Sequence, residues 1–366
     1  MKVAYIHDWL VISGGAEKVA REILACFPQA DVFCLVDFLD QKDREFILHG
    51  KSTKTSFIQN LPFAKSKYRN YLPFFPLAIE QFDLSEYDLV ISSSYAVAKG
   101  VLTHSNQTHI CYCHSPMRYA WDLYHHYLDT TPMGKWKRRV AKLTLHYLRN
   151  WDIASANRVD YFIANSDYIK RRIEKIYRRD AVVIHPPVAI DQFTFNKLKK
   201  DYYIAFSRLV PYKKLDIIAE AFRNMPDKKL IIAGGGPELK NLRKNCPENV
   251  TVTGELPFSA LLEKIQHAKA LIVAAEEDFG LTPVEAQACG TPVIAFGKGG
   301  YLETVIEHQT GMFFSEQTAE SIQDAVYKFE AVDWNYETCR KNAEDFSNTN
   351  FKTHLLTFIQ AKLKTV

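Results

Sequence analysis

The stretch ALIVAAEEDFGLTPVEAQACGTPVIAF, residues 270–296, predicts a strand, a loop, a short helix and a second strand. ALIVAA and PVIAF are short apolar runs, as expected of buried parallel strands. Pro283 suits the first turn of a helix, where its missing N–H costs nothing. The stretch is therefore a parallel β–α–β unit, and its acidic loop EEDFGLT lies at the carboxyl end of a strand.

The same alternation runs through most of the chain and restarts in the middle. Helical patterns lie between most of the strand patterns, which predicts parallel, doubly wound α/β sheets. The Pro186–Pro187 pair separates two series, so we expect two facing Rossmann-like domains, 1–185 and 186–349, with a deep cleft between them. The last helical pattern, 350–364, is amphipathic, and packing back on the first domain is an option for it. The predicted strands are 2–6, 30–36, 87–94, 109–114, 158–166 and 181–188, then 202–209, 229–236, 250–254, 270–275 and 292–296.

Composition sets the broad class of the protein. The chain has 366 residues, 47 % of them hydrophobic and 24 % charged, which is ordinary for a globular protein of two domains. A net charge of +4 does not argue for nucleic acid. Seven cysteines without regular spacing favour a reduced, cytoplasmic compartment. We find no apolar run of the roughly 18 residues that a spanning helix needs, and Asp8 comes too early for a signal peptide.

The acidic loop has the features of a ligand site. A helix N-terminus approached through a glycine is a natural diphosphate cradle. Carboxylates accept paired hydrogen bonds from diols, so Glu277 suits a sugar and Glu285 a ribose. The alternative is an acidic surface loop whose carboxylates favour the helix start. The backbone N–H groups expected to face the cleft are those of Gly280, Leu281 and Thr282.

Two other strand exits carry polar residues. In SRLVPYKK, 207–214, Arg208 and Lys213 could neutralise a diphosphate and stabilise it as a leaving group. Solvated surface cations are the alternative, and that alternative fits Lys214. In CYCHSPMRYAWD, 111–122, His114 follows a strand. Cys111 and Cys113 could join it as metal ligands, but C-x-C within one strand fits closed zinc sites poorly, so buried cysteines are favoured.

The glycine-rich turns and the lack of an Asp-x-Asp pair bear on which cofactors the protein could bind. Gly14–Gly15 is a turn but not G-x-G-x-x-G, so the dinucleotide fingerprint of a dehydrogenase is absent. A glycine pair alone is weak evidence, because tight turns explain most of them, and the same holds for GGGP at 234–237. We find no Asp-x-Asp pair that would hold a divalent metal against a diphosphate.

Two stretches of the first half are basic and aromatic. Residues 51–76 and 134–151 contain several Lys and Arg side chains and no acid. Such segments can lie on an anionic bilayer or face a phosphorylated acceptor. An amphipathic helix with a solvated basic face is the alternative for either stretch. Two of them in one half favour a surface role.

Together these motifs resemble one family. Glu277 and Glu285, within EEDFGLTPVE, resemble the E-x7-E signature of retaining GT-B glycosyltransferases of family 4. SRLVPYKK resembles the family's G-R-L-x-x-x-K-G, with Ser207 and Lys214 in place of its two glycines. Gly14-Gly15-Ala16-Glu17 resembles the N-terminal Gly-Gly-x-E loop, and His114 matches the family's cleft histidine. YCHSPMRYAWD and EEDFGLTPVEAQACGTPVIAFGKGGYLETV look like a mannosyltransferase-like subgroup that builds bacterial O-antigen and exopolysaccharide.

The resemblance implies a role for each matching residue. The second domain would bind a nucleotide diphosphate-sugar, with the sugar on Glu277, the ribose on Glu285 and the base near Glu255 and Leu256. His114 would sit beside the anomeric carbon. The family retains anomeric configuration by front-side attack and needs no metal or other cofactor. The implied catalytic residues are His114, Glu277, Arg208 and Lys213; the implied donor-binding residues are Gly14, Gly15, Arg208, Lys213, Glu255, Leu256, Glu277, Phe279, Gly280, Leu281, Thr282 and Glu285.

The expected function is transfer of mannose from GDP-mannose to a lipid-linked oligosaccharide, in the cytoplasm or on the inner face of the plasma membrane. A UDP-sugar donor stays open, because nothing in the sequence tells guanine from uracil. A nucleotide-sugar epimerase on the same scaffold would need its own acid and base carboxylates. A non-catalytic sugar-nucleotide-binding protein is the third class. No nucleic-acid partner is expected.

Overall fold

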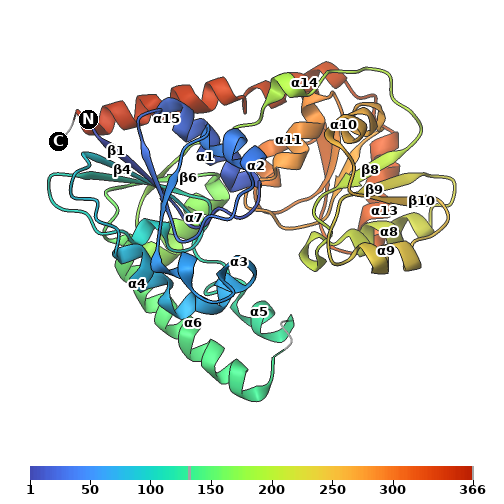
Figure 1. Ribbon diagram of the computed structural model, residues 1–366. Helices are drawn as coiled ribbons and strands as arrows, with labels where there is room; N and C mark the ends of the chain where they lie inside the picture. Colours follow the sequence, from blue (N-terminus) through green and yellow to red (C-terminus); the bar gives the residue numbers. More distant parts are fainter. Residues whose placement is uncertain (131–132, 365–366) are drawn as a thin grey trace. The chain divides into compact units, whose positions relative to one another are not determined.

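The structure is a computed structural model that describes residues 1–130 and 133–364. The chain divides into two compact units (Figure 1). The first is Met1–His185 together with the chain from Lys352 onward, and the second is Pro186–Phe351. Each unit is a parallel sheet with helices packed against it, so the predicted α/β class and its two Rossmann-like halves are confirmed.

The sheet of the first unit has seven parallel strands in the order β3-β2-β1-β4-β5-β6-β7. Their alternating side chains are buried on both faces, which is why the central strands have near-continuous apolar sequences. The order reverses between β1 and β4, so the carboxyl ends of these neighbours form a topological switch point. The strands are β1 (Val3–His7), β2 (Asp31–Cys34), β3 (Thr53–Thr55), β4 (Leu89–Ser94), β5 (Thr108–Cys113), β6 (Tyr161–Ala164) and β7 (Ala181–Val183).

Helices of very different length cover this sheet. The longest, α6, has 22 residues and covers most of the basic stretch 134–151. The C-terminal helix α15 packs on the unit through its later residues, because Lys352 Nζ lies 2.8 Å from Glu22 Oε2 and Phe358 contacts Tyr161. The helices are α1 (Gly15–Cys26), α2 (Gln41–Leu48), α3 (Ala64–Lys67), α4 (Phe75–Glu80), α5 (Tyr124–Thr130), α6 (Lys135–Ala156), α7 (Asp167–Tyr177) and α15 (Asn348–Leu363).

The other basic stretch, 51–76, is not one amphipathic helix. It contains the edge strand β3, two 3-10 turns at Phe57–Asn60 and Tyr68–Phe74, and the short helices α3 and α4. Pro62 and Pro73 explain the difference, because proline lacks the N–H that helix hydrogen bonding needs and restricts the residue before it. The alternative of a single helix is therefore wrong for this stretch.

The second unit has six parallel strands in the order β10-β9-β8-β11-β12-β13. Successive residues of β8 enter opposite cores: Tyr203 and Ala205 pack in one, Ile204 and Phe206 in the other. Helices therefore cover both faces. The elements are β8 (Tyr203–Phe206), β9 (Leu230–Ala233), β10 (Val250–Gly254), β11 (Leu271–Val273), β12 (Val293–Phe296) and β13 (Gly311–Phe314), with α8 (Leu215–Arg223), α9 (Leu239–Asn245), α10 (Phe258–His267), α11 (Leu281–Ala288), α12 (Tyr301–Thr304), α13 (Ala319–Glu330) and α14 (Tyr336–Glu344).

Candidate active site

The strand order of the second unit brings two of the predicted motifs together. β8 and β11 are neighbours at the point where the order reverses. The chain leaves β8 into SRLVPYKK and leaves β11 into the acidic loop. Ligands of such sheets bind beyond the carboxyl ends of the strands at the switch point. Segments about 65 residues apart in sequence therefore share the edge where a ligand site is expected.

An ion pair joins the two motifs. Lys213 Nζ lies 2.6 Å from Glu277 Oε1, and the two side chains are 19 % and 18 % exposed. Lys213 ends a 3-10 turn, Pro211–Lys213, that directs it back toward the strand edge. Arg208 is exposed, and within 1–130 and 133–364 its guanidinium makes no hydrogen bond or ion pair. One cation of the predicted pair is thus held by the acidic loop, and the other is open to solvent.

Helix α11 begins between the two predicted acids. It starts at Leu281, whereas the sequence pattern predicts a helix over 283–289, so Glu285 lies a full turn inside and is half-buried. The residue before it, Gly280, has φ +97°, which favours glycine, and a Cβ there would lie 2.6 Å from Tyr301 Cδ1. The N–H groups of Gly280, Leu281 and Thr282 donate to nothing in the described part of the chain. They can donate hydrogen bonds to an anion, as the N–H groups at helix N-termini do.

A glycine pair that the sequence analysis did not single out holds the acidic loop in place. The Gly300 N–H donates to the Glu277 carbonyl at 2.8 Å. A Cβ on Gly300 would lie 2.2 Å from Phe279 Cα, and a Cβ on Gly299 would lie 2.4 Å from the Glu277 carbonyl oxygen. Phe279 itself is buried, so only its backbone is available to a ligand. The signal in the sequence was GKGG directly after a strand.

The GGGP turn supports the Arg208 loop in the same way. A Cβ on Gly234 would lie 1.9 Å from the Ser207 carbonyl oxygen, and Gly234 has φ +140°. The Leu209 N–H donates to the Gly235 carbonyl at 2.8 Å. These glycines allow the GGGP turn and the Arg208 loop to approach closely. The sequence pattern had indicated a tight turn alone.

The remaining predicted residues of this unit lie beside the same edge. The Glu255 carboxylate is next to Gly235, 3.1 Å from where its Cβ would be. Leu256 packs against the apolar core. Lys213 and Thr282 line a narrow hollow between β8 and β11. Its lining is Phe206, Ser207, Lys213, Leu215, Ile218, Ile272, Val273, Ala274, Ala275, Thr282 and Tyr301.

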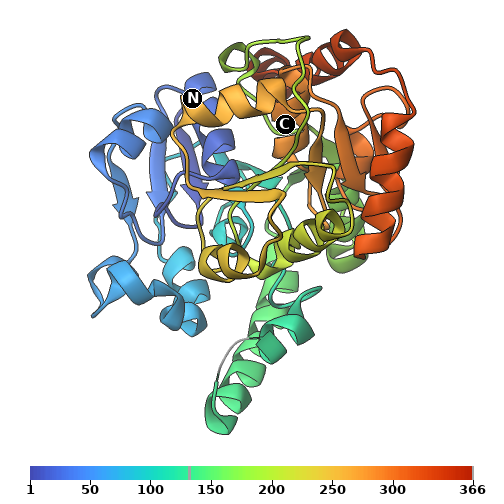
Figure 2. The same cartoon turned by 90° about the vertical axis from the view of Figure 1, so that its right-hand side faces the viewer.

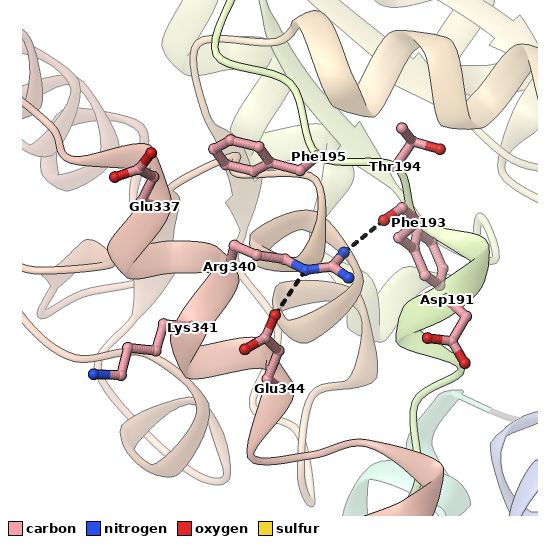
Figure 3. Close-up of a pocket in the computed structure, with 8 residues that line it drawn as sticks. All are labelled: Asp191, Phe193, Thr194, Phe195, Glu337, Arg340, Lys341 and Glu344. Carbon is pink, nitrogen blue, oxygen red and sulfur yellow. Dashed lines mark hydrogen bonds and ion pairs between the residues drawn. The ribbon is translucent and has the colours of Figure 1, made fainter.

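A larger hollow of the second unit lies elsewhere. It is an open space of about 790 Å³ between the chain after Ile190 and helix α14. In Figure 3, Arg340 stands at its centre and donates to the Phe193 carbonyl at 2.6 Å, while its Nε lies 3.2 Å from Glu344. The guanidinium also donates to the Ala288 carbonyl at 2.8 Å. Arg340 therefore fastens the chain after Ile190, and we assign this hollow no ligand.

In the first unit, the Gly14–Gly15 turn follows β1 at the switch point. The Gly14 N–H donates to Glu17 Oε2 at 3.0 Å, and the other oxygen of this buried carboxylate lies 3.4 Å from Nε2 of buried His7. Gly14 has φ −129°, which any residue can adopt. Glycine suits the position because a Cβ would lie 2.9 Å from Glu17 Oε2. Glu17 therefore fixes the turn as a helix cap.

His114 lies at the carboxyl end of β5. Its Nε2 is 2.8 Å from Ser93 Oγ, and its carbonyl accepts from Asn165 Nδ2 at 3.0 Å. Burial lowers the pKa of His114 to about 3, with a smaller contribution from nearby His7. The imidazole is thus neutral at physiological pH and acts as a hydrogen-bonding group, since a general base works best with a pKa near the working pH.

The cysteines beside His114 lie in the core. Cys111 and Cys113 are buried within β5, and burial raises the pKa of the Cys113 thiol well above its usual range. Across residues 1–130 and 133–364, no group of three or more His, Cys, Asp or Glu side chains is placed to hold a metal ion.

Two buried carboxylates of the first unit were missed by the sequence analysis. Asp8 follows β1 and accepts four backbone N–H groups, from residues 95 to 98, at 2.6–3.0 Å. Asp152, on α6, pairs with buried Lys99 and also accepts from Trp121 Nε1 at 2.7 Å and the Tyr177 hydroxyl at 2.9 Å. Asp8 fixes the loop after β4, and Asp152 joins α6 to Lys99, Trp121 and α7. The IHD at the end of the first strand was a signal for Asp8, whereas Asp152 had none.

The chain is similar to known glycosyltransferases. The profile described as Glycosyltransferase Family 4 matches residues 13–192, and that described as Glycosyl transferases group 1 matches residues 189–346. A GDP-mannose-dependent alpha-(1-6)-phosphatidylinositol monomannoside mannosyltransferase of Mycolicibacterium smegmatis is 29 % identical over 203 residues, 46 % of this chain and 53 % of that protein. A D-inositol 3-phosphate glycosyltransferase of Mycobacteroides abscessus is 26 % identical over 192 residues, 46 % of this chain and 43 % of that protein. The chain thus spans about half the length of the curated relatives it matches.

Solved structures extend the likeness to the whole fold. HepE of Anabaena, in complex with UDP, aligns with a TM-score of 0.72 and 17 % identity over 99 % of this chain and 100 % of that one. The lipopolysaccharide outer core galactosyltransferase WaaB aligns with a TM-score of 0.70 and 18 % identity over the same shares. The two profiles cover nearly all of the chain between them, and both sheets have the order and switch point described above. The chain has the GT-B fold, and it is similar to glycosyltransferase family 4 over residues 13–192 and to glycosyl transferases group 1 over residues 189–346.

Proposed function

We propose that the protein is a retaining hexosyltransferase that moves mannose from GDP-mannose to a lipid-linked oligosaccharide in bacterial surface polysaccharide synthesis. One observation carries the proposal. The 2.6 Å ion pair between Lys213 and Glu277 puts a cation and a carboxylate beside the N–H groups that begin α11, which find no acceptor within 1–130 and 133–364. A cation and free amides suit a diphosphate, and a carboxylate suits the hydroxyls of the sugar attached to it.

In the proposed reaction the diphosphate is the leaving group. The bond between the anomeric carbon and the diphosphate oxygen breaks, and the acceptor hydroxyl oxygen bonds to that carbon on the same face. The acceptor proton passes to the departing diphosphate. Lys213, Arg208 and the amides of α11 stabilise the negative charge that grows on the diphosphate. They would supply the stabilisation without a metal ion, so we expect transfer to continue in the presence of a chelator.

The other roles follow from the family resemblance. Glu277 holds hydroxyls of the transferred sugar, and Glu285 holds the ribose. Glu255 and Leu256 lie where the base would be. By the same resemblance, we expect His114 and the Gly14–Gly15 turn of the first unit to act on the donor. The lowered pKa of His114 supports a hydrogen-bonding role for it rather than proton transfer.

The relatives favour mannose, and the structural neighbours favour a second donor. The curated relative from M. smegmatis is named as GDP-mannose-dependent, which supports GDP-mannose at 29 % identity. The HepE structures hold UDP or UDP-glucose, at 17 % identity. A UDP-sugar is therefore the alternative donor. The expected location is the cytoplasm, at the inner face of the membrane that holds the acceptor. In the described ranges, no helix is long and apolar enough to cross a bilayer.

Thermal unfolding with added nucleotides tests the donor. A ligand at 100 times its dissociation constant stabilises the folded state by about 2.7 kcal/mol, which raises the midpoint measurably. We expect GDP and GDP-mannose to raise it, and UDP and UDP-glucose to do so less. A larger shift with the uridine ligands would make a UDP-sugar the donor instead of GDP-mannose. No shift with any of the four ligands would contradict the proposed donor site. Transfer is then scored as GDP release on adding acceptor lipids, and the proton coupling of the product's anomeric carbon reports retention.

A further inference from the structure

Helix α6 has an apolar face that its own unit does not cover. Leu145, Leu148 and Trp151 are buried and pack in the core of the first unit. Four other apolar residues recur at intervals of four, three and four, which places them on one line of a helix. This exposed stripe consists of Trp136, Val140, Leu143 and Tyr147, which are 78 %, 52 %, 71 % and 48 % exposed.

The stripe is bordered by positive charge. At 100° per residue, Lys135, Arg139 and Lys142 follow one side of it, and Lys137 lies on the other. All four are exposed. The helix has no Asp or Glu before Asp152, which is buried against Lys99. The surface of the stripe therefore presents apolar side chains between cations, without an acid.

The position of the helix leaves this stripe accessible. Figures 1 and 2 both show the first half of α6 extending beyond the sheet, with α5 alongside it. Arg138, which faces away from the stripe, contacts α5 through Asp129. The stripe from Trp136 to Tyr147 is about 16 Å long at 1.5 Å per residue. A hydrocarbon core is about 30 Å thick, so the stripe is too short to span it and has the length of a helix lying in the interface.

The other basic stretch of this unit is a weaker candidate. It also exposes large apolar residues, among them Phe63 and Phe74. Two of its cations, however, stack on its own rings: Lys67 over Phe63 and Arg69 over Tyr68. Its apolar residues also lie on separate short turns rather than on one line.

We propose that the stripe Trp136–Val140–Leu143–Tyr147 docks the protein on an anionic lipid surface. The apolar residues would enter the acyl boundary, and the bordering cations would lie at the negatively charged headgroups. The charge decides against a second copy of the same helix, because that would place the two sets of cations together. The link to acceptor lipids rests on the proposed function; membrane docking itself does not.

Flotation with vesicles tests the proposal. We expect the protein to float with vesicles of 30 % phosphatidylglycerol in phosphatidylcholine at low salt, and to bind phosphatidylcholine alone much less. Leu143→Glu puts a charge in the middle of the stripe and should weaken binding about 10-fold or more. Leu102→Glu is the matched control, since Leu102 is an exposed leucine of the same unit that does not belong to the stripe, and the variant should bind as wild type.

Two results would overturn the proposal. One is no flotation with the phosphatidylglycerol vesicles at low salt, and the other is equal flotation of Leu143→Glu and wild type. A dimer in solution that Leu143→Glu dissociates would assign the stripe to a second copy instead. A nucleotide-induced shift of the unfolding midpoint, unchanged in Leu143→Glu, shows that the variant is folded. The same measurement separates failure of docking from failure of the proposed donor site.

Discussion

Each unit contains a lysine–carboxylate pair, and the two pairs have opposite surroundings. Lys99 and Asp152 are 1 % and 0 % exposed, and Asp152 accepts two further hydrogen bonds, from Trp121 and Tyr177. Lys213 and Glu277 are 19 % and 18 % exposed, and the N–H groups that begin α11 have no acceptor among the residues that the structure describes. The first pair is complete, whereas the second leaves donors for a ligand.

The difference separates a structural role from a binding role. A buried charge costs several kcal/mol to desolvate, so it is tolerated only when its partners are all in place. Lys99 and Asp152 meet that condition and join α6 to α7 and to the turn that contains Lys99. A partly exposed cation keeps its solvation and can exchange partners, which a phosphate-binding lysine must do. Lys213 meets this second condition.

Removing Asp152 should have the largest effect on stability. In Asp152→Ala the Lys99 ammonium loses its partner inside the core, and breaking such a pair costs about 3–5 kcal/mol. That is a large share of the roughly 5–15 kcal/mol that stabilises a domain. Urea unfolding measures the change. Asp129→Ala removes an exposed partner of Arg138 and should change stability by less than about 1 kcal/mol. Equal effects of the two variants would contradict the comparison.

Removing Lys213 should instead affect transfer. Lys213→Met keeps the length of the side chain and removes its charge. Losing one group that stabilises the leaving diphosphate should lower kcat by about 100- to 1000-fold, with an unfolding midpoint close to wild type. Glu277→Gln tests the partner. Glu276→Gln is its control, because Glu276 is an exposed neighbour without an assigned role. A large loss of stability in Lys213→Met would make this pair structural as well.

The sequence predicted the loops that follow the strands better than the residues that hold those loops in place. The apolar runs around 202–209 and 270–275 are local patterns, and parallel strands carry their exit loops to one edge, so Lys213 and Glu277 could be placed together before the structure was known. The resemblance then gave them roles. Lys99 and Asp152 could not be paired, because they are 53 residues apart and neither belongs to a motif. Gly299 and Gly300 depend on close approach to another loop, which no spacing encodes.

Helix interruptions and helix start points could also be predicted only in part. Residues 51–76 contain three prolines, Pro62, Pro73 and Pro76, which break helix hydrogen bonding, whereas the basic composition alone fits one amphipathic helix. The N-terminus of α11 was placed two residues late because Pro283 marks only the first turn, while the left-handed Gly280 begins it. His7 and Glu17 are only ten residues apart, but His7 belongs to a strand and Glu17 to a helix. A periodic pattern within one element therefore does not predict their contact.

His114 gives a smaller effect that depends on pH. Its pKa is about 3 in the folded protein and about 6.5 in an unfolded chain, so the unfolded state binds more protons between these values. The free energy of unfolding should therefore rise with pH across this range, and the contribution of His114 should be fully present above about pH 6.5. Between pH 7 and pH 5 this contribution should fall by about 1–2 kcal/mol. His114→Gln should remove that part of the slope. Urea midpoints at several pH values measure it, and an unchanged slope would show that His114 is not buried as described.

The smallest effect concerns a departure from the family pattern next to Lys213. Lys214 has φ +58°, the left-handed conformation in which a side chain costs about 1 kcal/mol and glycine costs little. The family has glycine here. Lys214→Gly should relieve the strain, and the greater freedom of glycine in the unfolded chain offsets part of the gain, so we expect stabilisation of less than about 1 kcal/mol. Lys214→Ala is the control, since it removes the charge and keeps the strain. If both variants change stability equally, the charge rather than the backbone matters at this position. Unchanged transfer in Lys214→Gly, beside the loss in Lys213→Met, would confine the binding role to one lysine of the two.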